Sequence, residues 1–128
     1  MLAHPDRAEI PPCHKKGLVI KAYAPRINKD YCLAICGNQK ALGNWDPDKA
    51  IPMSDANFPE WQIELDASKL KFPLEYKFIL YHKEEKKADC WENNPNRYLA
   101  DPELKTNETL VISDRYAYFD IPVWKGAG

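Results

Sequence analysis

Two tryptophans in this sequence stand in polar, turn-rich surroundings rather than in the alternating apolar pattern of a strand. Trp91 begins the stretch WENNPNR, which is rich in asparagine, and Trp45 stands between LGN and DPD. The face of an indole packs well against the C–H groups of a sugar ring, and side-chain amides can bond the sugar hydroxyls. These residue types therefore indicate a shallow carbohydrate-binding surface.

Each of these residues also has a simpler interpretation. A tryptophan in a small β domain is more often a packing residue than a ligand platform, and asparagines form turns by bonding their own backbone. Lys77 could donate to a sugar hydroxyl, or it could be an ordinary solvent-facing strand residue. Trp61 alternates with Ile63 and Leu65 and is expected in the core. Neither Trp45 nor Trp91 is specific when it is considered alone.

The elements that would position these side chains are predicted to be short strands. Eleven prolines and five glycines divide the chain, and no stretch sustains a 3.6-residue apolar period over three turns. The candidate strands are residues 17–24, 31–37, 61–65, 74–81, 109–113 and 116–122. Their spacing predicts an all-β fold, a single immunoglobulin-like antiparallel β-sandwich (a distorted open barrel) of about seven or eight strands.

The segment LEYKFILY shows the clearest strand alternation. One face would carry Leu74, Tyr76, Phe78 and Leu80, and the other would carry Glu75, Lys77, Ile79 and Tyr81. This is the pattern of a half-buried antiparallel strand, so Lys77 is expected to face away from the main core. Turn residues predict loops at 37–49, 54–60, 82–90 and 92–103.

The charge balance bears on the class of partner. Lysine and arginine number 18 against 19 aspartates and glutamates, a formal net charge of −1. Such a chain has no electrostatic footprint for nucleic acid or an anionic membrane. No apolar run approaches the length of a membrane span. We therefore expect a neutral ligand, with no nucleic acid and no membrane as partner.

The cysteines and histidines give little support for a metal site. The four cysteines form no CxxC pair and the three histidines are scattered, so we expect neither a metal nor another cofactor. We interpret Cys32 and Cys36 as packing thiols, although disulfide pairing stays open. Because the first residues lack the apolar core of a signal peptide, we expect a cytoplasmic protein, with secretion as the alternative.

Three separated motifs occur along the chain: AICGNQKALGNWD, EYKFIL and WENNPNR. In this order and at these intervals, they resemble the successive signatures of carbohydrate-binding module family 20, the starch-binding domain. In that family a strand ends in a glycine and a short loop leads to Leu-Gly-x-Trp. A Glu-Tyr-Lys-Phe strand follows, and Trp-Glu-x-x-x-Asn-Arg comes last. The similarity covers residues 18–121, nearly the whole chain.

The resemblance implies a binding site for helical α-1,4-glucans. The family's main starch site has two tryptophans that stack on adjacent glucose units, and these match Trp45 and Trp91. Its strand lysine matches Lys77, and its hydroxyl-bonding asparagine matches Asn96. Glu92 follows the second tryptophan as in the family and would contribute a carbonyl or carboxylate contact. The implied ligands are starch, glycogen, maltooligosaccharides and cyclodextrins.

Many members of the family have a second sugar site that uses one aromatic residue from each of two loops. The first of these positions falls near Lys29 here, so that Tyr31 is the nearest aromatic residue. The second loop is shortened to SDANFPE and offers Phe58. Tyr31 and Phe58 are therefore the candidates for a weak second site, and edge-strand and core packing are their alternative roles.

The end of the chain resembles a domain junction. VWKGAG is similar to the segment where a starch-binding module meets the catalytic barrel in disproportionating 4-α-glucanotransferases of glycoside hydrolase family 77. We therefore expect a linker or extension at 1–16, the binding domain at 17–123, and a linker toward a C-terminal domain at 124–128. The domain itself would not be an enzyme, and the full-length protein would be a 4-α-glucanotransferase.

Two other classes of function remain as alternatives. One is an immunoglobulin-like protein-interaction module that packs on a neighbouring catalytic domain through its exposed aromatic residues. The other is a small glycoside hydrolase in which Glu92 would pair with Glu84, Glu85 or Asp89. Few apolar residues surround these carboxylates to raise a pKa, which disfavours the hydrolase. For Arg97 we expect a structural salt bridge.

Overall fold

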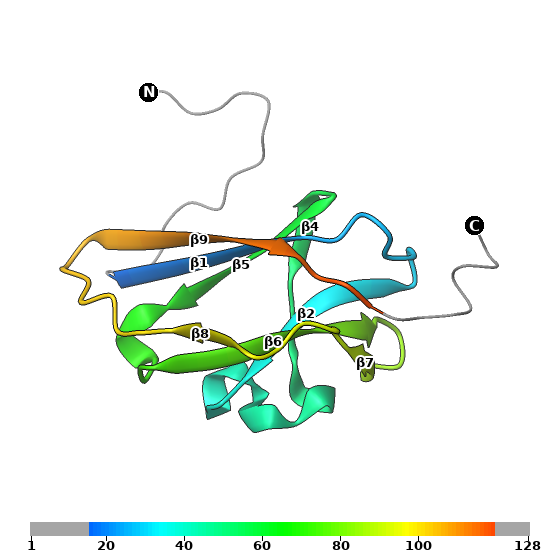
Figure 1. Ribbon diagram of the computed structural model, residues 1–128, viewed down its shortest axis with the longest axis horizontal. Helices are drawn as coiled ribbons and strands as arrows, with labels where there is room; N and C mark the ends of the chain where they lie inside the picture. The colour runs from blue at the N-terminus through cyan, green and yellow to red at the C-terminus, as the bar shows by residue number, and fades with distance from the viewer. Residues whose placement is uncertain (1–15, 120–128) are drawn as a thin grey trace.

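The structure is a computed structural model that describes residues 16–119, and two β-sheets face each other across one core (Figure 1). The strands are β1 (Lys16–Tyr23), β2 (Tyr31–Gly37), β3 (Ile51–Pro52), β4 (Ser54–Asn57), β5 (Glu60–Asp66), β6 (Leu74–His82), β7 (Lys87–Trp91), β8 (Arg97–Leu99) and β9 (Glu108–Tyr116). The 3-10 helices are η1 (Lys40–Trp45), η2 (Pro47–Lys49) and η3 (Ala67–Lys69). The all-β sandwich is therefore confirmed.

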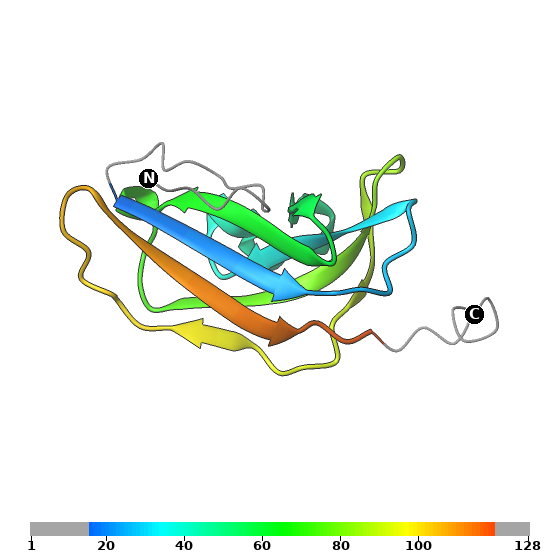
Figure 2. The same ribbon diagram turned by 90° about the horizontal axis from the view of Figure 1, so that it is seen from above.

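The two sheets differ in their strand pairing. The four-stranded sheet has the order β4-β5-β1-β9, and the five-stranded sheet has the order β3-β2-β6-β7 with β8 also paired to β6. The pairs are antiparallel except that β1 and β9 run parallel. Figure 2 shows β1 and β9 side by side along the length of the sandwich. The first and last strands thus close one sheet together.

Most of the predicted strands are confirmed, and one is wrong. The segments 17–24, 31–37, 61–65, 74–81 and 109–113 correspond to β1, β2, β5, β6 and β9. The segment 116–122 does not form the predicted strand, because β9 ends at Tyr116 and residues 117–119 are irregular. The rest of that segment and the expected linkers lie outside the described residues, apart from Lys16, which begins β1.

Four short strands were not predicted. They are β3, β4, β7 and β8; β4 and β8 lie within segments predicted to be loops, and β7 does so except for Trp91. Each pairs with a longer strand that comes from another part of the sequence or across a turn. Their own residues are too polar or too few to alternate, so only the neighbouring strand makes them extended.

β6 is the central strand of the five-stranded sheet, and both of its faces are covered. Phe78 and Leu80 on the predicted core face are fully buried. On the other face, Ile79 is also fully buried and Tyr81 donates a hydrogen bond to the backbone oxygen of Asp48 at 3.2 Å. The segment that contains η1 and η2 therefore packs on the outer face of β6. This packing brings the end of η1 to the middle of the sheet.

The described cysteines are free thiols. Cys32 and Cys36 are buried, as expected for packing residues, and Cys90 is half-buried. Cys36 donates to the backbone oxygen of Asp46 at 3.4 Å, which attaches β2 to the turn before η2. Burial, with the charge of Asp89 as the smaller cause, raises the pKa of the Cys90 thiol to about 11. Cys90 is therefore protonated at neutral pH.

Two features are absent from residues 16–119. Within this range no cluster of three or more histidine, cysteine, aspartate or glutamate side chains could hold a metal ion. The same part of the chain has no helix that is long and apolar enough to span a membrane.

Candidate functional site

Trp45 and Trp91 lie side by side although they are far apart in the sequence. Their ring centroids are 6.0 Å apart and their planes are tilted by 48°. Trp45 ends η1 and Trp91 ends β7, and both side chains are half-buried. Each ring is thus held against the protein while part of its surface remains exposed. A ligand that contacts both faces must be curved to follow the tilt between them.

The backbone before Trp45 has an unusual conformation. Gly43, Asn44 and Trp45 have φ angles of 81°, 53° and 61°, so three successive residues are left-handed. This conformation costs roughly 1 kcal/mol or more at a residue other than glycine. The fully buried side chain of Leu42 and a hydrogen bond from the Asp46 backbone N–H to the Gly43 oxygen hold the turn in place. The turn directs Trp45 toward β7.

Replacing Gly43 with alanine should disturb this turn. A Cβ atom at Gly43 would lie 2.6 Å from the backbone oxygen of Lys49, and the φ angle of +81° strains any other residue. We expect the free energy of unfolding to fall by about 1 to 3 kcal/mol and the indole N–H resonance of Trp45 to shift. Urea unfolding and a proton–nitrogen NMR spectrum would measure the two effects.

Gly17 supplies a matched control for this substitution. Its φ angle lies outside the left-handed region, and an added Cβ would meet the side chain of Thr109, which can move, rather than backbone. Gly17→Ala should therefore leave the Trp45 resonance in place. Equal shifts of that resonance in both variants would contradict the role assigned to Gly43.

Lys77 lies on β6 beside Trp91, and Asn96 lies just before β8, which pairs with β6. The Nζ atom of Lys77 lies 6.0 Å from the centroid of the Trp91 ring, a cation–π distance. The exposed side chain of Asn96 donates to Oε2 of Glu75 at 3.5 Å, and Glu75 shares a strand face with Lys77. The structure therefore places Trp45, Lys77, Trp91 and Asn96 near one another, and their role in binding a sugar stays a prediction. We call these four residues the tryptophan cluster.

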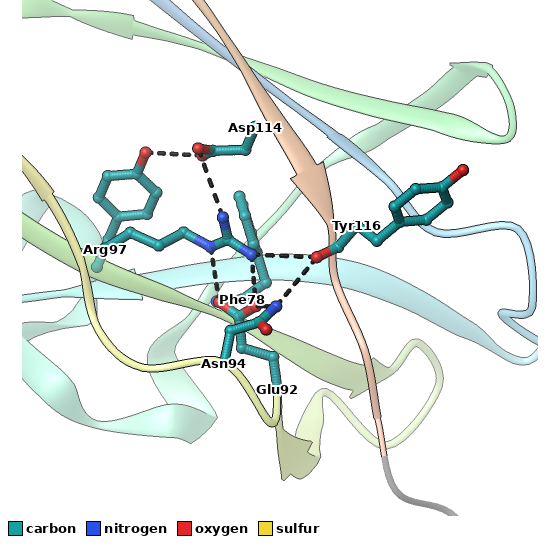
Figure 3. Close-up of polar contacts among 7 residues, drawn as sticks. Phe78, Glu92, Asn94, Arg97, Asp114 and Tyr116 are labelled. Atoms are coloured by element: carbon teal, nitrogen blue, oxygen red, sulfur yellow. Dashed lines mark hydrogen bonds and ion pairs between the residues drawn. The ribbon is translucent and has the colours of Figure 1, made fainter.

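Glu92 occupies a different environment from its neighbour Trp91. Its side chain is only 2% exposed. Oε2 accepts from the backbone N–H of Phe78 at 2.8 Å and from Nε of Arg97 at 3.0 Å (Figure 3). Oε1 accepts from Arg97 at 2.7 Å and from Nδ2 of Asn94 at 2.9 Å. The predicted carboxylate contact with a sugar is therefore wrong, because both oxygens are already used inside the protein.

The predicted structural salt bridge of Arg97 is confirmed. The guanidinium pairs with both oxygens of Glu92, lies 3.5 Å from Oδ1 of Asp114, and stacks over the ring of Phe78 at 4.8 Å (Figure 3). Burial lowers the pKa of Arg97, but its hydrogen bonds and the charges of Glu92 and Asp114 more than offset this and raise it. Arg97 therefore stays charged and ties the loop after Trp91 to β9.

Three residues of this network were not predicted from the sequence. Asp114 accepts from the Tyr76 hydroxyl at 2.7 Å, and burial and that carboxylate raise the pKa of Tyr76. Asn94 donates to Glu92 and also to the backbone oxygen of Tyr116 at 3.0 Å. No motif marks Asp114, and the motif that contains Tyr76 gives no sign of its bond to Asp114, because the two residues come from different strands. The bonds of Glu92, Asn94 and Arg97 therefore fasten the loop 92–96 to β6 and to the end of β9.

Tyr31 and Phe58, the candidates for a second sugar site, belong to different sheets. Tyr31 begins β2 and packs edge-on against His82, with centroids 5.0 Å apart. Phe58 lies between β4 and β5, is 51% exposed, and packs against Trp61 at 5.9 Å. Trp61 is buried in the core, as expected. Each candidate thus has its own packing partner, and the second site stays a prediction.

Comparison with known sequences adds a family match. Residues 19–111 match the family model of the starch binding domain. The chain is 35% identical over 83 residues to cyclomaltodextrin glucanotransferase of Bacillus sp. (strain 1-1), covering 62% of this chain and 11% of that protein. It is 32% identical over 63 residues to glucoamylase-1 of Schizophyllum commune, covering 49% of this chain and 10% of that protein. The match thus spans about a tenth of the length of these relatives.

Solved structures share the fold. The glycoside hydrolase family 15 glucoamylase of Hypocrea jecorina superposes with a TM-score of 0.64 and 21% identity, over 79% of this chain and 17% of that one. The family 20 module of the maltotetraose-forming amylase from Pseudomonas saccharophila STB07 superposes with a TM-score of 0.60 and 16% identity, over 77% of this chain and 99% of that one. At these identities the likeness concerns the fold alone.

Proposed function

This chain belongs to the starch-binding domain family, carbohydrate-binding module family 20, and from this premise we propose that it is a non-catalytic module that binds α-1,4-glucans. The observation that carries the proposal is the pairing of Trp45 and Trp91, whose rings lie 6.0 Å apart at a tilt of 48°. A helical glucan is curved, and its successive glucose rings can lie against two tilted aromatic faces.

Each residue of the tryptophan cluster would have its own role. Trp45 and Trp91 would stack on adjacent glucose rings through the C–H groups of the sugars. The ammonium group of Lys77, beside the Trp91 ring, would donate to a sugar hydroxyl, and the amide of Asn96 would bond another. For Glu92 the remaining role is a contact through its backbone carbonyl, because its carboxylate is bonded to Arg97.

These contacts predict a modest affinity. Two stacking contacts and three or four hydrogen bonds, each near 1 kcal/mol, sum to about 5 to 6 kcal/mol. The corresponding dissociation constant lies between roughly 40 and 200 μM. Such an affinity suits a module that holds an enzyme near a polymer with many equivalent binding sites.

Isothermal titration calorimetry of the 128-residue chain tests the proposal. We expect β-cyclodextrin and maltoheptaose to bind in this range, and cellohexaose, whose glucose units are β-1,4-linked, to bind at least tenfold more weakly because an extended chain cannot follow both rings. Absence of heat with both α-glucans, or equal affinity for cellohexaose, would overturn the proposal.

We further propose that a catalytic domain is covalently linked to this module. The curated relatives are enzymes of which this chain matches about a tenth, a cyclomaltodextrin glucanotransferase and a glucoamylase. The resemblance of the chain's last residues makes a 4-α-glucanotransferase our choice for the partner domain. The module would then bring that enzyme to its glucan. Release of glucose from maltotriose by the full-length protein, with transfer of the maltosyl unit to a second maltotriose to give maltopentaose, would support this choice, whereas purely hydrolytic release would contradict it.

The alternative functions predict other outcomes. In a protein-interaction module, the tryptophan cluster would bind a neighbouring domain, and glucans would not compete for it. In a glycoside hydrolase, Glu92 would need a carboxyl group that can transfer a proton to or from a reacting sugar, but Glu92 is buried and pairs with Arg97. The bonds of Glu92 therefore disfavour the hydrolase.

A further inference from the structure

A concave surface lies between the loop that follows Trp91 and the end of β9. This groove has a volume of about 560 Å³, and its lining residues are Asn94, Pro95, Arg97, Tyr116 and Tyr118. We call it the tyrosine groove. Figure 3 shows the side chains of Asn94, from the loop, and Arg97, from the start of β8, reaching toward Tyr116. Neither Trp45 nor Trp91 lines it, and neither do Tyr31 and Phe58, so it is separate from both sites considered above.

The groove presents aromatic rings to solvent. The rings of Tyr116 and Tyr118 are stacked, with centroids 5.5 Å apart and planes 22° apart, and they are 45% and 56% exposed. Tyr23 packs edge-on against Tyr116 at 4.8 Å and is itself 37% exposed. Clustered exposed aromatic side chains of this kind mark a binding surface more often than scattered ones do.

The charge of Arg97 is neutralised inside the protein. Its guanidinium bonds both oxygens of Glu92, pairs with Asp114 at 3.5 Å, and donates to the backbone oxygen of Tyr116 at 3.3 Å. Two carboxylates thus surround one cation. A phosphate or carboxylate ligand would gain little from such an arginine, so the chemistry of the groove favours an uncharged ligand.

The dimensions of the groove favour a small ligand over a protein. A stable protein interface uses about 20 to 30 residues on each side, whereas the residues of this groove form a patch only a fraction of that size. A volume of about 560 Å³ falls within the range of small-molecule sites. A short, neutral ligand with apolar faces and hydroxyl groups matches both the size and the chemistry.

The groove is physically continuous with the loop that carries part of the tryptophan cluster. The backbone N–H of Asn93 donates to the oxygen of Tyr118 at 2.7 Å, and Asn94 donates to the oxygen of Tyr116 at 3.0 Å. Trp91 and Asn96 stand at the two ends of this loop. We propose that the tyrosine groove is a second α-1,4-glucan site, which takes one or two glucose units. This inference rests on the proposed function.

An NMR titration of the 128-residue chain with maltoheptaose tests the inference. We expect backbone amide shifts at residues 116–118 as well as at Trp91, and in the Trp91→Ala variant the shifts at 116–118 should persist. Adding Tyr118→Ala to that variant should weaken the affinity of the groove about fivefold, since one stacking face is lost. Tyr118→Phe keeps the ring and should keep the affinity within twofold.

Tyr98 supplies the matched control. It is 65% exposed on β8 but does not line the groove. Tyr98→Ala should leave unchanged both the amide shifts that maltoheptaose causes at residues 116–118 and the affinity derived from them. An equal effect of Tyr98→Ala and Tyr118→Ala would overturn the inference.

Other outcomes separate the two proposals. Shifts confined to the tryptophan cluster would reject the groove and leave the proposed function standing, whereas the absence of shifts everywhere would reject both. Hydroxyl-radical footprinting of the full-length protein gives an independent result. If Tyr118 of the full-length protein is oxidised less than in the 128-residue chain before any glucan is added, a neighbouring domain covers the groove and the inference is wrong.

Discussion

Glu92→Ala is expected to lower the free energy of unfolding by about 3 to 5 kcal/mol, the usual cost of removing one partner from a buried ion pair. The carboxylate bonds the guanidinium of Arg97 at 2.7 and 3.0 Å and the backbone N–H of Phe78 at 2.8 Å. After the substitution, the N–H of Phe78 would lose its acceptor, and among residues 16–119 Arg97 would keep only Asp114 as an anionic partner. Urea unfolding followed by tryptophan fluorescence would measure the loss.

Two further variants make this result interpretable. Glu92→Gln keeps an acceptor for Phe78 but removes the charge, so its loss should be intermediate. Glu84→Ala removes a carboxylate from the exposed turn between β6 and β7, where it should change stability by less than about 0.5 kcal/mol. If Glu92→Ala were as mild as Glu84→Ala, the network would not stabilise the fold as the structure indicates.

Trp91→Ala is expected to weaken binding of β-cyclodextrin and maltoheptaose at least tenfold. The substitution removes one of the two stacking faces and also the ring beside which Nζ of Lys77 lies at 6.0 Å. Loss of about 1.4 kcal/mol corresponds to a factor of ten, which one stacking contact and a weakened neighbour can supply. Isothermal titration calorimetry would give the affinity, with far-UV circular dichroism to confirm that the variant is folded.

The conservative variant separates stacking from packing. Trp91 also packs partly against the core, so its removal affects stability as well as the binding surface. Trp91→Phe keeps an aromatic face and should recover most of the affinity, while Tyr98→Ala, at an exposed position outside the tryptophan cluster, should bind as the wild type does. An unchanged affinity in Trp91→Ala would remove Trp91 from the proposed site.

The two substitutions differ in what they should change. Glu92 and Trp91 are neighbours, yet one side chain is buried in the ion-pair network and the other contributes to the tryptophan cluster. In Glu92→Gln, we expect the decrease in the free energy of unfolding to be larger than the decrease in the free energy of glucan binding. In Trp91→Ala, we expect the decrease in the free energy of binding to be the larger of the two. Comparison of unfolding and titration data for the two variants would show which function each side chain serves.

Several features of the fold were predictable from local sequence. The alternation in residues 74–81 predicted β6 and its core face, where Phe78 and Leu80 are fully buried. The five longest described strands were all predicted, because each contains a run of apolar residues long enough to be identified without knowledge of the neighbouring strand. The composition of the turn at WENNPNR predicted a polar surface around Trp91. The occurrence of this stretch after the other two motifs, which contain Trp45 and Lys77, indicated that these residues belong to the same site.

The sequence by itself therefore determined the class of fold, the long strands and the residue types at the surface around Trp91. Only the tertiary structure decided the direction of the Glu92 side chain, because its partners Phe78 and Arg97 come from β6 and β8. The short strands, the parallel pairing of β1 with β9 and the stacked tyrosines at the end of β9 depend on neighbours in the same way. The physical reason is that alternation and turn chemistry act within a few residues, whereas hydrogen bonds and ion pairs form between whichever groups the folded chain brings together.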